Sequence, residues 1–156
     1  MLISIIIPTY NRAAIVMRAI DSVLNQSYKD FELIVVDDGS TDQTLKYLKS
    51  YTDPRLKILS KEHQGVAAAR NHGVKHAKSD WVCFLDSDDV WRKHKLSEQL
   101  RFHHQNKDIM ISQTEDVWVR NGVRVNKKKS HAVREGDIFE SSLRLCLVCC
   151  SSVMVN

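Results

Sequence analysis

The chain has 156 residues, of which 43% are hydrophobic and 27% charged, and its net charge at pH 7 is +4. This length fits one domain with a real core, and the composition excludes a disordered or fibrous protein. The positive charge is modest, and a solvated surface explains it about as well as an anionic partner does. We expect no nucleic-acid partner.

The N-terminal run Ile3-Ser4-Ile5-Ile6-Ile7 is rich in β-branched residues and predicts a buried strand, ended by Pro8. The run is far too short for a signal peptide or a membrane span. We therefore expect a cytoplasmic protein, with peripheral attachment at the inner face of the membrane as the alternative.

Helical and extended patterns then alternate along the chain. Apolar residues recur every three or four positions in the helical segments, and aliphatic runs mark the strands. The predicted elements are a helix at 15–24, a strand at 31–36, a helix at 45–51, a strand at 56–59, an Ala-rich helix from 64 to about 77, and a strand at 81–85. Asn11 is the predicted N-cap of the first helix, and Ser40 or Thr41 that of the second. This alternation predicts a largely parallel, doubly wound sheet flanked by helices.

Beyond residue 90 the pattern changes. The predicted elements are a helix at about 92–104, a strand at 109–111, a hairpin of 117–119 and 123–125 joined by Asn121-Gly122, a helix within 136–145, and a strand at 153–155. Lys127-Lys128-Lys129 is a charge run typical of a solvated surface, with contact to an anionic acceptor or a membrane as the alternative.

The four cysteines do not predict a disulfide framework or a zinc site. Cys146 and Cys149 have C-x-x-C spacing, but no second ligand pair is present and His131 is badly placed to help. We expect Cys83, Cys146, Cys149 and Cys150 to act as small buried apolar residues.

Polar residues follow three of the predicted parallel strands: Thr9, Asp37-Asp38, and Asp86-Ser87-Asp88-Asp89. Ligands of such sheets bind beyond the carboxyl ends of the strands, so these residues should share one rim. Crowded carboxylates repel one another unless a cation or substrate compensates them. Oxygen ligands of this kind suit Mg²⁺ or Mn²⁺, and Mg²⁺ is usually held by one or two carboxylates and substrate phosphates. Capping of the next helix by Asp88 or Asp89 is the competing interpretation, and it explains one acid better than three.

Four segments, taken together, resemble the family 2 glycosyltransferases, which have the GT-A fold. These segments are residues 5–12, 35–42, 65–71 and 84–89, and the similarity in order and spacing extends to about residue 106. Each motif alone is weakly specific, but four in register are highly specific. The resemblance implies an α/β fold of the GT-A type, with a Rossmann-like sheet and a small β-hairpin after the acidic motif.

The resemblance also implies an activity, namely inverting transfer of a sugar from a nucleotide-diphosphate sugar, most often a UDP-sugar, to an acceptor hydroxyl. The acceptor would be a saccharide or a lipid-linked sugar, as in cell-surface polysaccharide biosynthesis. The residues implied to bind the nucleotide sugar are Pro8, Thr9, Tyr10, Asn11, Asp38, Arg70, Asp86 and Ser87. Asp88, together with Asp86, would bind Mn²⁺ or Mg²⁺, which stabilises negative charge on the departing diphosphate.

On this resemblance, residues 1–156 form a single incomplete domain. Residues 1–106 would be the nucleotide-sugar-binding half and 107–156 the start of the acceptor-side half. The family's general base is an acid farther downstream; Glu115-Asp116 imitates its motif but occurs too early. Residues 151–155 resemble the strand before the base-bearing region, so we expect the base beyond Asn156.

Three other functions compete with sugar transfer as interpretations of the sequence. A nucleotide-binding module without turnover is the main alternative, since the expected base is absent. A haloacid-dehalogenase-like phosphatase carries its D-x-D motif on the first strand, whereas Asp86-Ser87-Asp88 follows about the fourth. A sugar-nucleotide nucleotidyltransferase would need a glycine-rich, basic loop after the first strand, and Pro8-Thr9-Tyr10-Asn11-Arg12 is not such a loop.

Overall fold

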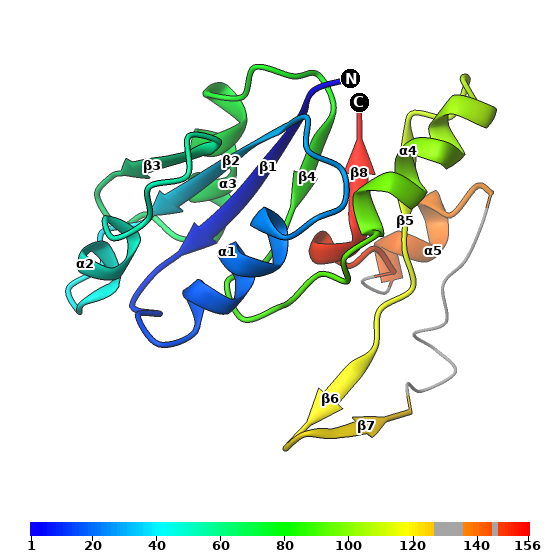
Figure 1. The fold of residues 1–156 in the computed structure, drawn as a ribbon. Coiled ribbons are helices and arrows are strands. Elements are labelled where there is room, and N and C mark those ends of the chain that lie inside the picture. Colours follow the sequence, from blue (N-terminus) through cyan, green and yellow to red (C-terminus); the bar gives the residue numbers. More distant parts are fainter. Residues whose placement is uncertain (127–135, 145–146) are drawn as a thin grey trace.

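The computed structural model describes residues 1–126, 136–144 and 147–156, so Lys127–Lys129, His131 and Cys146 lie outside the described residues. A six-stranded sheet in the order β3-β2-β1-β4-β8-β5 forms the centre (Figure 1). The strands are β1 (Ile3–Thr9), β2 (Phe31–Asp37), β3 (Leu56–Ser60), β4 (Val82–Phe84), β5 (Ile111–Gln113), β6 (Trp118–Arg120), β7 (Val123–Val125) and β8 (Val153–Val155). The helices are α1 (Val16–Leu24), α2 (Thr44–Leu48), α3 (Val66–Lys75), α4 (Lys95–Gln105), α5 (Phe139–Arg144) and the 3₁₀ turn η2 (Cys150–Ser152).

The first four strands of the sheet are parallel, as the alternating pattern predicts. β1 pairs with β2 on one side and with β4 on the other, and β2 pairs with β3. β8 lies between β4 and β5 and is antiparallel to both. Strands from the beginning and the end of the chain therefore share one mostly parallel sheet, and the α/β fold is confirmed. The division at residue 106 stays a prediction.

Helices cover both faces of this sheet, with α1 on one face and α3 on the other (Figure 1). Side chains alternate between the two faces along a strand. On β1, Ile3, Ile5 and Ile7 pack in the cluster that includes α1, whereas Ile6 packs in the cluster that includes Ala69 of α3. Burial on both faces explains why β1 is an almost continuous apolar run.

α3 approaches β1 most closely at Gly73. A Cβ atom at this position would lie 2.6 Å from Cγ2 of Ile6, whose side chain is fully buried. We expect Gly73→Ala to lower the free energy of unfolding by about 2 kcal/mol, because overpacking outweighs the gain in helix propensity. Urea unfolding followed by circular dichroism measures this change. Lys75→Ala, at an exposed position of the same helix, is the control, and a Gly73→Ala chain as stable as the parent would contradict the close packing.

Lys95, at the start of α4, is a buried cation. Its Nζ donates a hydrogen bond to Oε1 of Gln99 at 2.5 Å and lies 4.1 Å from the ring centroid of Trp91. Burial lowers the pKa of Lys95 to about 8, and negative charge on Cys83 or Cys149 acts in the opposite direction. The charged form is therefore less stable in the folded chain than in water.

Stability should consequently depend on pH through Lys95, whose pKa falls from 10.5 to about 8 on folding. Between these values the unfolded chain binds more protons, so the free energy of unfolding rises with pH, in total by about 3 kcal/mol. Urea unfolding from about pH 7 to about pH 10 should show this rise in the parent chain relative to Lys95→Met. Lys46→Met, which changes an exposed lysine, should behave as the parent. An equal pH dependence in the parent and Lys95→Met would contradict the prediction.

The hairpin predicted around Asn121-Gly122 is confirmed as β6 and β7. Both turn residues have positive φ, 51° for Asn121 and 77° for Gly122, which suits a two-residue hairpin loop. Other elements occur with shifted bounds. The strand predicted at 109–111 is β5, the helix predicted at 92–104 is α4, and the helix predicted within 136–145 is α5. Among the described residues, no helix combines the length and the hydropathy needed to cross a membrane.

The predicted helix caps are wrong. The observed N-caps are Ile15 for α1, Gln43 for α2 and His94 for α4, and none makes a side-chain cap hydrogen bond. The predicted caps were Asn11 for α1 and Ser40 or Thr41 for α2, and capping of α4 by Asp88 or Asp89 was the competing interpretation of the acidic motif. These residues lie before the first helical turn, and Asn11, Ser40, Thr41 and Asp89 bond to residues of other loops instead.

Among the described cysteines, Cys83 agrees with the predicted buried, apolar role, whereas Cys149 and Cys150 are less buried than predicted. Cys83 is fully buried, and its burial raises the pKa of the thiol to about 11. Cys149 and Cys150 are half-buried, and all three are free thiols.

Candidate nucleotide-sugar site

The carboxyl ends of β1, β2 and β4 meet at one rim of the sheet. Thr9 and Asp37 are partners in the parallel ladder, and the N–H of Asp38 donates to the carbonyl of Thr9 at 2.9 Å. On the other side of β1, the N–H of Leu85 donates to the carbonyl of Ile6 at 3.0 Å. The strand order reverses at β1, and ligands of open α/β sheets bind outside the strand ends at such a point. The rim predicted from the sequence is therefore present.

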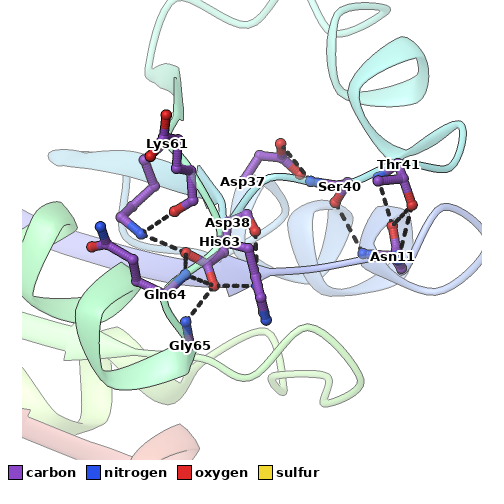
Figure 2. A network of polar contacts seen from close by, with 10 residues as sticks. Asn11, Asp37, Asp38, Ser40, Thr41, Lys61, His63, Gln64 and Gly65 are labelled. Atoms are coloured by element: carbon purple, nitrogen blue, oxygen red, sulfur yellow. Dashed lines mark hydrogen bonds and ion pairs between the residues drawn. The ribbon is translucent and has the colours of Figure 1, made fainter.

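Asn11 joins the loop after β1 to the loop after β2 (Figure 2). Its Oδ1 accepts hydrogen bonds from the backbone N–H of Thr41 at 2.8 Å and of Asp42 at 3.3 Å, and its own N–H donates to Oγ of Ser40 at 2.9 Å. The φ angle of Asn11 is 51°, in the left-handed region that asparagine tolerates better than most residues. Asn11 thus fixes the shape of the rim.

Asp38 is held by the loop after β3 (Figure 2). Its Oδ1 accepts a hydrogen bond from Nζ of Lys61 at 2.6 Å, and its Oδ2 accepts one from the N–H of Gly65 at 2.7 Å. The N–H of Gln64 lies 3.2 Å from both oxygens. Burial raises the pKa of Asp38, but these hydrogen bonds outweigh it, and the pKa is lowered below its usual 3.8. Asp38 is therefore an oriented, ionised carboxylate.

The aromatic ring of Tyr10 is linked to this carboxylate through His63. Tyr10 is exposed, and its ring is stacked with the imidazole of His63, with centroids 4.0 Å apart and an interplanar angle of 22°. Nδ1 of the same imidazole lies 2.9 Å from Oδ2 of Asp38. Tyr10, His63 and Asp38 thus form one group.

The acidic motif after β4 faces two arginines from other segments. Asp86 forms an ion pair with Arg70 of α3, and Arg12, from the loop after β1, lies 4.0 Å from Oδ2 of Asp88. The side chain of Asp88 is 55% exposed, whereas the neighbouring Ser87 is buried. The motif therefore presents one carboxylate paired with arginine and one that remains accessible to solvent.

Ser151 ties the acidic motif to the segment before β8. Its hydroxyl accepts a hydrogen bond from the N–H of Asp86 at 3.0 Å and donates one to Oδ2 of Asp89 at 2.5 Å. The carbonyl of Ser151 accepts a hydrogen bond from Nε1 of Trp91 at 2.6 Å. Partial burial raises the pKa of Asp89, the Ser151 bond opposes this, and the negative charge of Asp88 raises it further. Asp89 therefore anchors the loop rather than capping α4.

Three buried polar atoms near this rim have no hydrogen-bond partner among the described residues. They are Oγ1 of Thr9, Oδ1 of Asp37 and Nε of Arg70. Buried polar groups in folded proteins are nearly always satisfied by protein, ordered water or ligand. Water or a polar ligand at the rim would supply these partners. Pro8 is also implied to be a site residue. It lies buried in β1, where it pairs with Val36 of β2.

The acidic residues fit a divalent cation only as part of a larger ligand set. Within the described ranges, no group of three or more His, Cys, Asp or Glu side chains could hold a metal ion. Asp86 and Asp88 supply hard oxygen ligands, and Mg²⁺ is commonly bound by one or two carboxylates completed by substrate phosphates. The donor set therefore fits a cation that arrives with a diphosphate.

The structure adds Lys61 and Ser151, which the sequence did not single out as site residues. For His63 the sequence predicts a solvated polar residue rather than a metal ligand, and the structure places its half-exposed ring against Asp38. Lys61 and His63 follow β3. Because ligands bind beyond the carboxyl ends of parallel strands, the same argument that placed Thr9 and Asp38 at the rim could have placed these two residues there. Ser151 gives no such signal, because its contact depends on an antiparallel strand far along the chain. Asp116, interpreted as a false match to a catalytic acid, contributes a negative charge that raises the pKa of Asp89.

The parallel strands, the reversal of strand order at β1 and the acidic rim define an α/β protein with a polar rim at the switch point of its sheet, and the comparisons specify the family. Residues 4–147 match the model "Glycosyl transferase family 2", and the chain belongs to this family. It is 42% identical over 106 residues to the glucosyltransferase WfgD of Escherichia coli, covering 67% of this chain and 42% of that protein. WfgD is named for glucose transfer from UDP-Glc to GlcNAc-diphosphoundecaprenol.

Two solved structures share the GT-A fold with this chain. Residues 1–349 of TarS from S. aureus, in complex with UDP-GlcNAc, match with a TM-score of 0.65 and 35% identity, over 69% of this chain and 32% of that one. The mannosyltransferase PcManGT from Pyrobaculum calidifontis, in complex with GDP-Man and Mn²⁺, matches with a TM-score of 0.61 and 29% identity, over 65% of this chain and 32% of that one. The chain spans 22% to 62% of the length of the curated relatives it matches.

Proposed function

We propose that this protein transfers a sugar, with inversion, from a UDP-sugar to a hydroxyl group of a saccharide or lipid-linked acceptor. The observation that carries the proposal is the rim itself, where an ionised carboxylate, an exposed tyrosine, two arginines and two acids gather at the reversal of the sheet. UDP-GlcNAc in TarS and the UDP-Glc donor of WfgD support a UDP-sugar for this chain.

The rim residues divide into two groups along the proposed donor. Thr9, Tyr10 and Asp38 would contact the nucleobase, with Pro8 and Asn11 shaping this end of the site. The hydroxyl of Thr9, which has no hydrogen-bond partner in the described part of the chain, supports this role. Arg70, Asp86 and Ser87 would lie near the ribose and the diphosphate. An arginine next to an acid suits this position, because a guanidinium binds phosphate oxygens through fixed N–H groups.

Asp88 and Asp86 would hold Mn²⁺ or Mg²⁺ with the diphosphate oxygens. The exposure of Asp88, and the Mn²⁺ in the PcManGT complex, support this assignment. When bound, the cation would stabilise negative charge on the departing nucleoside diphosphate. Arg70 and Arg12 would add positive charge at the same end, so that this end of the site favours the product diphosphate.

The acceptor proposal rests on WfgD, whose name states a lipid-linked diphosphate acceptor. A lipid-linked acceptor would require the protein to work at the membrane, so we propose peripheral attachment at its cytoplasmic face. The general base is proposed to lie beyond Asn156.

Sugar transfer by the full-length protein tests this proposal. The protein would be incubated with Mn²⁺, single UDP- or GDP-sugars, and lipid-linked saccharides extracted from membranes. We expect a product from a UDP-sugar, with the opposite anomeric configuration to the donor by NMR. Retention of configuration, or transfer from GDP-sugars alone, would contradict the proposal. A chain carrying Asp88→Ala is the negative control.

A further inference from the structure

His63 contacts two residues of the candidate nucleobase site at once, Tyr10 and Asp38. Its imidazole stacks on the ring of Tyr10 at 4.0 Å, and its Nδ1 lies 2.9 Å from Oδ2 of Asp38 and 3.1 Å from the carbonyl of Asp38. The side chain of His63 is nevertheless 52% exposed. Figure 2 shows it beside Asp38, on the loop that also carries Lys61, Gln64 and Gly65.

The other contacts of Asp38 come from groups that are fixed in place. The backbone N–H groups of Gln64 and Gly65 cannot leave without moving the loop, which is itself tied to β2 by a hydrogen bond from the N–H of Lys61 to the carbonyl of Asp37 at 3.0 Å. The side chain of Lys61 is only 12% exposed. His63 is different, because a half-exposed side chain can change rotamer without any backbone change. Its ring is therefore the removable partner of Asp38.

The contacts of this ring are those that a nucleobase would make. A planar heterocycle lies flat on an aromatic ring and directs a ring N–H to a carboxylate. Uracil has such an N–H at N3 and guanine has one at N1. Cytosine and adenine have an unprotonated acceptor nitrogen at the corresponding edge, which a carboxylate repels.

We propose that the imidazole of His63 occupies the nucleobase subsite of the free protein, and that a base with a ring N–H displaces it to stack on Tyr10 and bond to Asp38. The inference rests on the proposed function, since it assumes that this rim binds a nucleotide. It selects uracil or guanine over cytosine and adenine. His63 is then a competitor of the donor rather than one of its ligands.

Such competition lowers apparent affinity in a defined way. Only the fraction of molecules with His63 rotated outward can bind, so the observed dissociation constant is the intrinsic one divided by that fraction. Removing the imidazole should therefore tighten UDP binding, by about three- to tenfold if the outward rotamer is a minor population. Removing the ring of Tyr10 should weaken binding, because the base then loses its stacking surface.

Calorimetric titration of UDP in the presence of Mn²⁺, into the full chain and its His63→Ala and Tyr10→Leu variants, tests the proposal. We expect His63→Ala to bind UDP more tightly and Tyr10→Leu to bind it more weakly. CDP should bind far more weakly than UDP in all three chains. Inorganic diphosphate, which has no base, should bind the parent and His63→Ala equally.

A second measurement follows the imidazole itself by NMR. In the free chain the ring protons of His63, assigned by their absence in His63→Ala, should be shifted upfield by the ring current of Tyr10. Saturating UDP should move them toward the position of a solvent-exposed histidine, and inorganic diphosphate should not. UDP binding that His63→Ala leaves unchanged or weakens, or resonances that UDP does not move, would overturn this inference and leave the proposed function standing. Failure of every chain to bind UDP and GDP would overturn the proposed function, and this inference with it.

Discussion

Replacement of Asp38 by alanine is expected to lower the free energy of unfolding by about 3 kcal/mol, the largest loss we expect from any single change at the rim. The side chains of Asp38 and Lys61 are 3% and 12% exposed, so the substitution leaves a largely buried ammonium without its counter-ion, with only the carbonyl of Glu62 as an acceptor among the described residues. It also removes the acceptor for the N–H groups of Gln64 and Gly65. Breaking one side of a buried pair costs far more than the pair contributes, because the remaining charge stays desolvated.

Urea unfolding at neutral pH measures this loss, and an exposed ion pair provides the matched control. Asp30 lies 3.0 Å from the N-terminal ammonium, and its side chain is 59% exposed, so Asp30→Ala should cost less than about 1 kcal/mol. The double variant Asp38→Ala, Lys61→Met should be more stable than Asp38→Ala alone, since it removes the orphaned charge. A similar small loss for Asp38→Ala and Asp30→Ala would contradict the structure of the loop after β3.

The stability due to Asp38 should also depend on pH. Its pKa is lowered below 3.8 in the folded chain despite the opposing effect of burial. The contribution of Asp38 to the free energy of unfolding is therefore complete at pH values above the pKa of the unfolded chain. It is lost as the pH falls through the lower pKa of the folded chain.

Replacement of Asp88 by alanine is the second large effect, and it should change binding rather than folding. Asp88 is exposed, and Arg12 at 4.0 Å is the one ion-pair partner it has among the described residues. We expect the variant to unfold like the parent but to bind UDP at least about tenfold more weakly in Mn²⁺, equivalent to roughly 1.4 kcal/mol. Calorimetry with and without the metal measures this difference.

A second exposed aspartate provides the control for the effect of Asp88→Ala on UDP binding. Asp108 is exposed and lies in the segment after α4, away from the rim, so Asp108→Ala should leave the metal-dependent affinity unchanged. If Asp88→Ala binds UDP as tightly as Asp108→Ala does, in Mn²⁺ and after chelation, then Asp88 is not a metal ligand.

Much of the fold and of the rim can be predicted from local patterns. β1 and β2 are buried on both faces and so appear as continuous aliphatic runs, and their alternation with helices leads directly to a parallel sheet. The hairpin follows from Asn121-Gly122, whose conformations few other residues adopt at low cost. The rim then follows from topology, since parallel strands end on the same side.

Contacts between distant segments could not be predicted in this way. The prediction of the helix caps was wrong because two polar side chains bond to other loops rather than to the helix that follows them. Asn11 accepts a hydrogen bond from Thr41, and Asp89 accepts one from Ser151. These partners lie in loops that are distant in sequence and become adjacent only when the sheet forms. The hydrogen bond from Lys61 to Asp38 is another such contact, because nothing in the sequence spacing of the two residues predicts that they meet. Local preference is a weak guide wherever a non-local partner satisfies the same polar group.

The central claim is that the acidic rim binds a nucleoside diphosphate together with a divalent cation. Calorimetric titration of UDP into the chain, first with Mn²⁺ and then after chelation of the metal, tests it most directly. We expect one UDP per chain with Mn²⁺ and a loss of affinity of at least about tenfold without it. UDP binding of equal strength in the two titrations, or no binding of UDP or GDP in either, would contradict the claim.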